Sequence, residues 1–254
     1  ELADEPDRYR AAADDAALKR VVLDDANSAG RSMTPHALDG IVGSTLGNRE
    51  IRATIASIAG AGGRAVYVAV DITDLESLER ALGTVRSEVG PITGLVHGAG
   101  VLADKLIVDK TSAQFDRVFE TKVMGLGNLL SATDHDDLRV LCLFSSIAAR
   151  TGNAGQADYA MANEVLNKVA IDQRAQRGDG CVVKSLGWGP WAGGMVTPEL
   201  ARHFEAIGVD LIPIDVGARM LVDEIAGPQT DQVEVFLGGD LLAPEEPAVQ
   251  RVGV

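Results

Sequence analysis

Short apolar runs alternate with amphipathic segments along the chain from Arg64 onward. The segments between the runs carry apolar residues at the spacing of a helix. This alternation is typical of βαβ units on a parallel sheet, and it predicts an open α/β fold. Five runs rich in apolar and β-branched residues are expected to form its strands: Ala65–Val70, Gly94–His97, Val140–Phe144, Cys181–Leu186 and Val233–Leu237.

Polar residues predict where two of the helices begin. Thr73 with Glu76 has the spacing of a capping box ahead of one apolar stripe, and Thr111 with Gln114 repeats that spacing ahead of another. Two further helices are expected at about 157–173 and 216–225. The two stripes consist of Leu75, Leu78, Leu82 and Val85, and of Phe115, Val118, Phe119, Leu126 and Leu129.

Residues 1–63 differ from the rest, because they contain two helical patterns and no convincing strand. The polar stretch Asp24–Pro35 contains Gly30 and Pro35, which are helix breakers. We therefore expect a helical insertion at 1–63, a core at 64–240 and an interdomain linker at 241–254. The first pattern consists of Leu38, Val42 and Leu46, and the second of Ile51, Ile55 and Ile58.

Composition argues against several classes of function. The 254 residues include 37 acidic and 23 basic ones, and the formal net charge of −14 repels nucleic-acid phosphates in the absence of a basic run. No apolar run approaches the roughly 18 residues of a membrane span, and no secretory signal is present. Cys142 and Cys181 lie in apolar runs without metal-ligand spacing, so we expect buried thiols in a reducing cytoplasm and no metal site.

Lys122 lies on the apolar face of the helix that follows Thr111. It is seven residues after Phe115 and four before Leu126, which directs its ammonium toward the sheet. A buried ammonium costs several kcal/mol unless it has polar partners or a lowered pKa. Two outcomes are open on periodicity alone: the side chain extends to solvent, which is the favoured outcome, or it meets polar partners.

Candidate partners follow the strand Val140–Phe144. Ser145 and Ser146 lie at its carboxyl end, which is the edge where open α/β sheets bind ligands. After a loop that contains glycines, Tyr159 and Asn163 share one face of a helix at i and i+4. Taken singly, such residues usually form caps or packing contacts. Together with Lys122 they form a candidate catalytic site.

This combination resembles the short-chain dehydrogenase/reductase superfamily, and specifically the ketoreductase domains of polyketide synthases. Most of the superfamily places a lysine four residues after the tyrosine, whereas these ketoreductases place an asparagine there and the lysine on the preceding long helix. The chain has the second arrangement, with Asn163 after Tyr159 and with Lys122 upstream. Further matching segments extend the resemblance over about residues 64–239: Val70–Asp74, Val96–Leu102 and Gly187–Met195.

The resemblance implies NADPH-dependent reduction of a β-ketoacyl group on the phosphopantetheine of an acyl carrier protein, among neighbouring synthase domains. Tyr159 would donate the proton, with its pKa lowered by Lys122, while Ser146 bonds the carbonyl oxygen and Asn163 links the site to backbone or water. Asp71 would contact the adenine amino group, although without the resemblance a helix cap explains it equally well. The implied cofactor contacts are Asp71, Ile72, His97, Gly98, Ala99, Lys122, Tyr159, Pro190 and Trp191, and those for substrate and stereocontrol are Asp104, Gln156 and Met195.

Three features refine the resemblance. Ketoreductases that give the D-configured (3R) alcohol usually carry Leu-Asp-Asp after the His-Gly-Ala-Gly turn, and this chain has Leu102-Ala-Asp104. The opposite class has a tryptophan near the position of Thr151, and none lies between Ser146 and Tyr159, so a D product is favoured. Residues 192–212 resemble a mobile lid over the substrate. The helical stretch at 34–52 resembles the insertion of iterative polyunsaturated-fatty-acid and enediyne synthases.

One element of the family is absent from the sequence, since no glycine-rich strand–turn–helix precedes residue 64 to bind the pyrophosphate. The expected fold is therefore a Rossmann-like doubly wound parallel sheet that lacks its first strand–helix–strand unit. That unit, with the basic residue that selects NADPH, is expected in upstream sequence or on another chain. The start at Glu1 rather than methionine suggests a piece of a longer polypeptide.

Two other functions remain open. One is a non-catalytic structural domain of the ketoreductase kind, which normally lacks the four residues named above or the nucleotide site. The other is a free-standing reductase of a small ketone, which the placement of Asn163 and Lys122 disfavours.

Overall fold

The computed structural model describes residues 2–227 and 231–238. The chain forms two compact units, Glu1–Ala69 and Val70–Val254. The linker expected at 241–254 lies outside the described residues, so that expectation stays a prediction.

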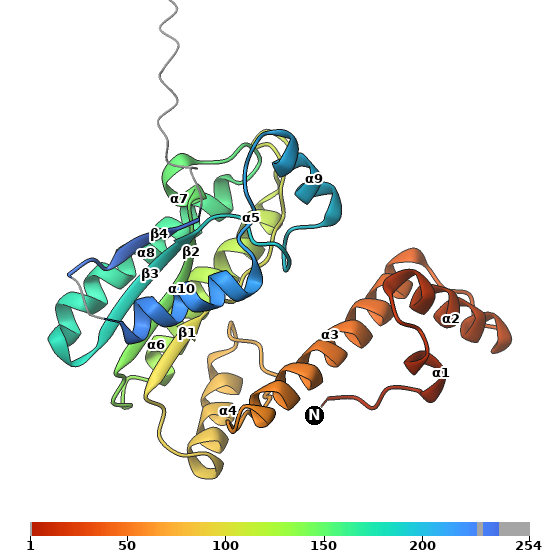
Figure 1. Ribbon diagram of the computed structural model, residues 1–254, viewed down its shortest axis with the longest axis horizontal. Coiled ribbons are helices and arrows are strands. Elements are labelled where there is room, and N and C mark those ends of the chain that lie inside the picture. Colours follow the sequence, from red (N-terminus) through yellow and green to blue (C-terminus); the bar gives the residue numbers. More distant parts are fainter. Residues whose placement is uncertain (1, 228–230, 239–254) are drawn as a thin grey trace, which may run out of the picture. The chain divides into compact units, whose positions relative to one another are not determined.

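The first unit is a helical hairpin with a short helix packed on it (Figure 1). It consists of α1 (Asp7–Arg10), α2 (Asp15–Ser28) and α3 (Pro35–Gly60). Leu18 and Val22 of α2 pack against Val42 of α3 in a small core. Arg49 of α3 ties α1 to this core, because its guanidinium donates to the carbonyl oxygens of Tyr9 and Ala12.

Two expectations for this unit were wrong. The two helical patterns belong to one continuous helix, because Thr34 caps α3 at the amide of Ala37 and Pro35 occupies its first turn. A proline there begins a helix rather than breaking one, since the first amides have no helical partner. The polar stretch that begins at Asp24 is the end of α2, whose start is capped by Asp14.

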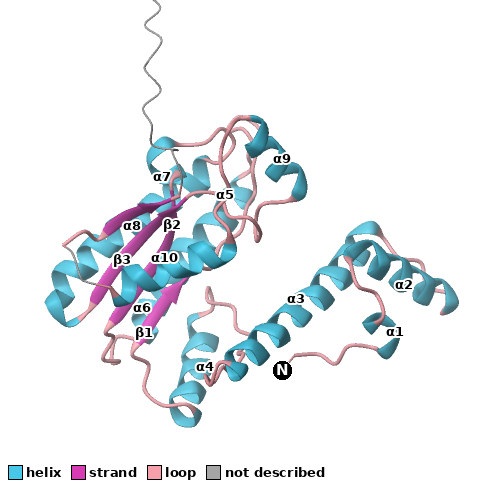
Figure 2. Cartoon of the chain, viewed as in Figure 1, coloured by secondary structure: helices cyan, strands magenta, loops and turns pink. Residues whose placement is uncertain are grey.

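In the described residues of the second unit, four strands form a parallel sheet in the order β1-β2-β3-β4 (Figure 2). Since all four strands run parallel, their carboxyl ends lie at one edge, and Ser146 stands beside Trp188 there. The strands are β1 (Gly94–His97), β2 (Val140–Ser146), β3 (Val182–Trp188) and β4 (Glu234–Leu237). The helices are α4 (Leu75–Glu88), α5 (Ser112–Phe119), the π-helix η1 (Glu120–Met124), α6 (Gly125–Ala132), α7 (Ala148–Thr151), α8 (Ala157–Arg177), the 3₁₀ turn η2 (Gly178–Gly180), α9 (Pro198–Ala206) and α10 (Ile214–Ala226).

Helices cover both faces of the sheet (Figure 2). On one face, Leu141 and Leu143 of β2 pack with Leu126 of α6 and Leu166 of α8. On the other face, apolar residues of α10 pack on β2 and β3, together with Cys142. The layers are those of a doubly wound α/β fold, as the alternation of apolar runs with amphipathic segments predicts. Cys142 and Cys181 are both buried and free.

The strand expected at Ala65–Val70 is absent. Residues 64–71 carry no strand, and Val66, Tyr67 and Val68 are exposed. None of the described strands pairs with this segment, and a strand without a ladder partner is not stable in water. On the described part of the sheet β1 is an edge strand, and its Val96 is half exposed.

Two helix starts test the capping predictions. The capping box of Thr111 and Gln114 is confirmed. The box of Thr73 and Glu76 is wrong, because Asp74 caps α4 by accepting from the amide of Ser77, and the Thr73 amide and hydroxyl instead donate to Asp71.

The helix expected to run without interruption after Thr111 is broken by η1, a π-helical turn of five residues. This turn carries Lys122, so it sets the direction of that side chain.

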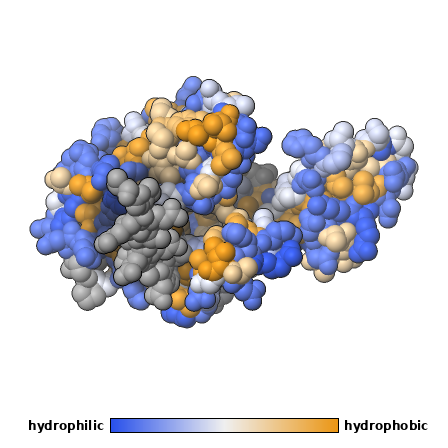
Figure 3. All heavy atoms as spheres, turned by 90° about the horizontal axis from the view of Figure 1, so that it is seen from above, coloured by the Kyte–Doolittle hydropathy of each residue, from blue (hydrophilic) through white to orange (hydrophobic). Residues whose placement is uncertain are grey.

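The surface of the molecule mixes polar and apolar side chains, as the face in Figure 3 shows. None of the helices in the described ranges combines the length with the apolar character that a membrane crossing requires.

Candidate functional site

A cavity of about 430 Å³ lies at the carboxyl ends of β1, β2 and β3. One wall carries polar groups from η1, the end of β2 and the start of α8. The opposite wall is apolar and comes from the end of β3 and the segment 192–212. The polar residues that line it include Lys122, Ser145, Ser146, Tyr159, Asp104 and Gln156.

Lys122 is buried, with 3% of the residue exposed. Its Nζ donates a hydrogen bond to the carbonyl oxygen of Phe144 at 3.0 Å, and it lies 5.6 Å from the centre of the Tyr159 ring. That distance is within the range of a cation–π contact. Burial lowers the pKa of Lys122 to about 8. The favoured expectation that this side chain extends to solvent is therefore wrong, and the alternative with polar partners describes the structure.

The backbone around Lys122 explains how the ammonium reaches β2. His97, at the end of β1, lies with its Nε2 3.0 Å from the carbonyl oxygen of Lys122. Since that oxygen can only accept, Nε2 carries the hydrogen. Gly100 makes room for the lysine, because a Cβ there would lie 3.0 Å from Lys122 Cε. A π-helical turn, a histidine and a glycine thus hold one side chain, and π-turns often mark functional sites.

Ser146, Tyr159 and Asn163 reach the same region from β2 and α8. Tyr159 lies in the first turn of α8, and Asn163 follows one turn later and donates from Nδ2 to the carbonyl oxygen of Tyr159 at 2.8 Å. Ser145 fixes this helix to the sheet by donating to the carbonyl oxygen of Asn163 at 3.1 Å. Within the described residues, Asn163 Oδ1 is buried and has no hydrogen-bond partner. Of the four predicted residues, Lys122, Ser146 and Tyr159 thus line the cavity, and Asn163 lies behind Tyr159, bonded to its carbonyl oxygen.

The pKa of Tyr159 departs from the expectation. Burial raises it above its ordinary value, and the polar side chains of Ser146 and Asn163 act in the opposite direction without outweighing burial. The charge of Asp104 raises it further. The expected net lowering of this pKa is therefore wrong, because burial outweighs the groups that lower it. The phenol is consequently protonated at neutral pH, which is the form that can donate a proton.

The residues predicted for substrate and stereocontrol meet at this cavity. Gln156 donates from Nε2 to Asp104 Oδ2 at 2.8 Å. Met195 lines the cavity near Gly100, since a Cβ on that glycine would lie 3.6 Å from Met195 Cε.

Aromatic rings form the apolar wall. The ring of Trp188 lies 5.5 Å from that of Phe144 and 4.7 Å, edge on, from that of Trp191, measured between ring centres. The segment 192–212 is closed at its base, because Ala192 donates to the Ile212 carbonyl and Ile212 donates to that of Pro190. Its residues Leu200, Phe204, Ile207 and Val209 also face the cavity.

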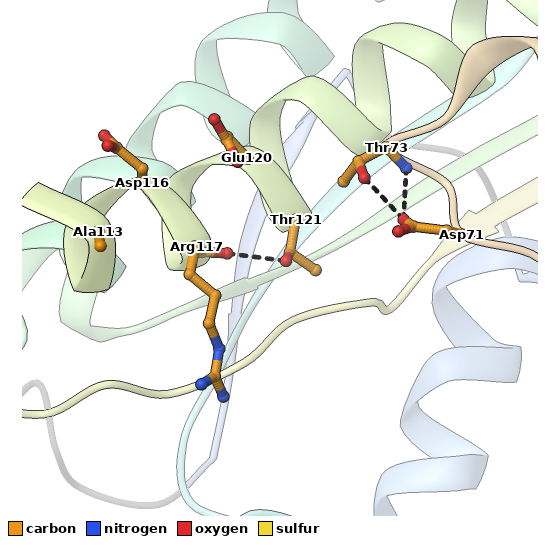
Figure 4. Close-up of a pocket in the computed structure, with 7 residues that line it drawn as sticks. All are labelled: Asp71, Thr73, Ala113, Asp116, Arg117, Glu120 and Thr121. Carbon is orange, nitrogen blue, oxygen red and sulfur yellow. Dashed lines mark hydrogen bonds between the residues drawn. The ribbon is translucent and has the colours of Figure 1, made fainter.

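Asp71 lines a separate cleft of about 480 Å³ (Figure 4). Asp71 Oδ1 accepts from the amide and hydroxyl of Thr73, and these bonds hold the pKa of Asp71 below its ordinary value. The far side of the cleft is formed by α5 and by Glu120 and Thr121 of η1. One π-turn therefore contributes Thr121 to this cleft and Lys122 to the cavity.

The other predicted cofactor contacts lie at or near the cavity and the cleft. Ile72 follows Asp71 but does not line the cleft; Asn128 donates to its carbonyl oxygen, and its side chain packs against Gly125. Gly98, Pro190 and Trp191 line the cavity, whereas the side chain of His97 is turned to the backbone of Lys122. Ala99 follows Gly98 in the same turn and lines neither space.

Several residues of the site were not predicted from the sequence. The resemblance gives a catalytic role to Ser146 and none to Ser145, and nothing in the spacing reveals the bond of Ser145 to α8. Trp188 was noted only as part of a motif, and its buried Nε1 has no hydrogen-bond partner among the described residues. In those residues, no group of three or more His, Cys, Asp or Glu side chains could hold a metal ion.

Comparison with known proteins decides the family. A family model of the KR domain matches residues 33–193, which is more than half of the chain. The chain belongs to the ketoreductase (KR) domain family. One polyunsaturated fatty acid synthase subunit of Thraustochytrium sp. is 39% identical to this KR domain over 240 residues, which are 92% of the chain and 8% of that relative.

Solved structures agree with this assignment. A ketoreductase from the first module of phoslactomycin biosynthesis in Streptomyces sp. HK803 has a TM-score of 0.63 and 32% identity, and the match covers 71% of the KR domain and 41% of that chain. A short-chain dehydrogenase from Burkholderia cenocepacia J2315, in complex with NADP, shares the fold with a TM-score of 0.65 at 19% identity, over 74% of the KR domain and 81% of that chain. The predicted polyketide-synthase family and Rossmann-like fold are confirmed.

The bond between His97 and the backbone of Lys122 predicts a pH dependence of stability. Burial lowers the pKa of His97 from 6.5 to about 4, so between these values the unfolded chain binds more protons than the folded one. The stabilisation by neutral His97 is complete above about pH 6.5 and is lost as the pH falls toward 4. Relative to His97→Gln, which keeps a donor, wild-type unfolding free energy should fall by up to about 1.4 kcal/mol per pH unit in this interval. Urea unfolding at several pH values measures this difference, and parallel profiles would contradict it.

Proposed function

We propose that this KR domain reduces the β-keto group of an acyl chain on an acyl carrier protein to the β-hydroxyacyl group, with NADPH as the reductant. The observation that carries the proposal is the buried Lys122 ammonium, which contacts the ring of Tyr159 at a cavity also lined by Ser146. Membership in the ketoreductase family and the similarity to a polyunsaturated fatty acid synthase support it.

The residues present fit the two ends of a nicotinamide cofactor. At one end, Lys122 offers an ammonium to a ribose hydroxyl, Gly98 leaves space in the turn after β1, and Pro190 and Trp191 offer an apolar wall to a flat ring. At the other end, Asp71 Oδ2 accepts none of the hydrogen bonds from Thr73 and faces the cleft, where it could accept from the adenine amino group. When bound, the cofactor supplies the hydride that attacks the ketone carbon.

We further propose that the pyrophosphate-binding unit, with the basic residue that selects NADPH, is supplied by upstream sequence or by another chain. Ahead of residue 64, the described residues form no strand followed by a glycine-rich turn and a helix that could bind the pyrophosphate. The experiments below therefore use the complete polypeptide that contains this chain.

The roles of the four residues follow from their surroundings. Negative charge builds on the ketone oxygen during reduction, so donors must be directed at that oxygen. Tyr159, held protonated by burial, donates the proton, and Ser146 Oγ hydrogen-bonds the same oxygen. The Lys122 ammonium then stabilises the charge left on the tyrosine. The unpartnered Asn163 Oδ1 would accept from a water that resupplies the proton.

Two features support a D-configured (3R) product. Asp104 is kept at the third position of the Leu-Asp-Asp pattern, and it accepts from Gln156 at the cavity that Tyr159 also lines. No tryptophan occupies the loop between Ser146 and Tyr159. The apolar residues of 192–212, which face this region, would cover the acyl chain and limit access of water.

The product of the reaction tests this proposal directly. The complete polypeptide, given NADPH and a β-ketoacyl thioester, should oxidise the cofactor and form the D alcohol as the main product. Cofactor oxidation is followed by absorbance, and the product is separated by chiral chromatography. No oxidation with NADPH or NADH would contradict the reductase function, and a predominantly L product would contradict the role given to Asp104.

Replacement of Tyr159 tests the proton donor. Tyr159→Phe removes the hydroxyl and keeps the ring under the Lys122 ammonium, so ketone reduction should be abolished while cofactor affinity stays nearly unchanged. Steady-state kinetics and fluorescence titration with NADPH measure the two quantities. Retention of more than about a tenth of the activity would show that another group donates the proton.

A further inference from the structure

A second buried lysine lies near the cavity and has no role in the reaction proposed above. Lys110, in the loop before α5, forms an ion pair with Asp158 of α8 at 2.6 Å, and the two side chains are 3% and 1% exposed. Neither residue lines the cavity. Burial of two charges carries a large desolvation cost, and apolar residues of similar volume often stabilise a protein as well or better. Stability alone therefore gives little reason for this pair.

Each member of the ion pair also forms a hydrogen bond with the backbone at or next to a residue that lines the cavity. Lys110 Nζ also donates to the carbonyl oxygen of Ala103, the residue before Asp104, at 2.9 Å. Asp158 Oδ1 accepts from the backbone amide of Tyr159 at 2.9 Å. One continuous path of hydrogen bonds and charge thus joins the backbone beside Asp104 to the backbone of Tyr159.

Two neighbouring bonds connect the same segments. The amide of Lys105 donates to the carbonyl oxygen of Gly155 at 3.0 Å, and Gln156 donates to Asp104. At Gly155 the φ angle is +85°, and an added Cβ would lie 3.5 Å from the backbone of Lys105, so the two backbones run close together. Residues 103–105 and 155–159 are therefore held as one assembly, in which Lys110 and Asp158 form the buried part.

We propose that the Lys110–Asp158 ion pair is a positioning element that fixes Asp104 relative to Tyr159 and thereby selects the face of the ketone that is reduced. The inference rests on the proposed reductase function, because it concerns the product of that reaction. A ketone can present either face to one proton donor. The side chains at the entrance of the cavity decide which orientation of the ketone leads to reaction. Of those groups, Asp104 is exposed on a loop, and the bond of Lys110 to Ala103 restrains that loop from within the protein.

The double variant Lys110→Met/Asp158→Leu tests the inference in the complete polypeptide. It removes both charges and their bonds to Ala103 and Tyr159 while keeping apolar volume in the space, so the melting temperature should change little. We expect the ratio of D to L alcohol to fall by about tenfold or more and kcat to fall by a similar factor, with a smaller change in KM, because displacement by about 1 Å can cost a reaction that much. Amide hydrogen exchange at residues 103–106 should become about tenfold faster.

A second variant keeps the test valid if the first does not fold. Lys110→Met/Asp158→Asn also removes both charges, but the asparagine Oδ1 can still accept from the Tyr159 amide. Only the connection to Ala103 is then lost, and the ratio of D to L alcohol should still fall.

A buried lysine on β3 provides the matched control. Lys184 is also 3% exposed, and it donates to the Gln232 carbonyl oxygen and pairs with Glu224, away from the cavity. Lys184→Met should lower stability but leave the product ratio and the exchange at 103–106 unchanged. An equal loss of selectivity in this control would overturn the inference, because any buried lysine would then have the same effect.

Other outcomes separate this inference from the proposed function. A folded Lys110/Asp158 variant with wild-type product ratio and wild-type exchange would overturn the positioning role. If the wild-type polypeptide reduces no ketone, the proposed function fails instead. The exchange measurement then still decides whether the pair restrains residues 103–106.

Discussion

The ammonium of Lys122, held out of water beneath the carboxyl edge of the sheet, is the constraint on which the arrangement of the site depends. A charge in that place needs a partner, and the carbonyl oxygen of Phe144 provides one at the point where β2 ends. The side chain reaches it because a π-helical turn presents Lys122 to the sheet and because Gly100 leaves room beside it. His97 then fixes the backbone of the same turn from β1. Three elements of the second unit are thereby joined around one charged group.

Burial shifts the pKa values of Lys122 and Tyr159 in opposite directions. It lowers the pKa of Lys122 to about 8 and raises that of Tyr159, so at neutral pH a cation lies over the ring of a protonated phenol. A protonated phenol beside a cation is suited to give up its proton, since the cation stabilises the resulting anion. The buried pair Lys110–Asp158 contacts the same tyrosine through its backbone amide. Groups that react are therefore distinct from the groups that hold them in place.

The sequence predicted the family, the doubly wound fold and three residues that line the cavity, Lys122, Ser146 and Tyr159, because strand ends and helical spacing determine where such side chains lie. Three features could not be predicted. The segment Ala65–Val70 has the composition of a strand, but a strand also needs a neighbour, which composition does not reveal. Helical spacing directed Lys122 toward the sheet, as found, but it revealed neither the π-turn at 120–124 nor the Phe144 carbonyl oxygen that partners the buried ammonium. Asp74 rather than Thr73 caps α4 because Asp71 engages Thr73, a competition between polar neighbours that spacing alone does not resolve. The roles of Ser145 and of the Lys110–Asp158 pair depend on contacts between distant segments.

The burial of Lys122 is the central claim, and its titration tests it most directly. The ammonium groups of lysine side chains can be followed by nuclear magnetic resonance as the pH is raised, with the Lys122 signal assigned by its loss in Lys122→Met. This one group should titrate at about pH 8, well below the ordinary lysine value of 10.5. A Lys122 that titrates at that ordinary value would have its ammonium in water, and the central claim would be contradicted.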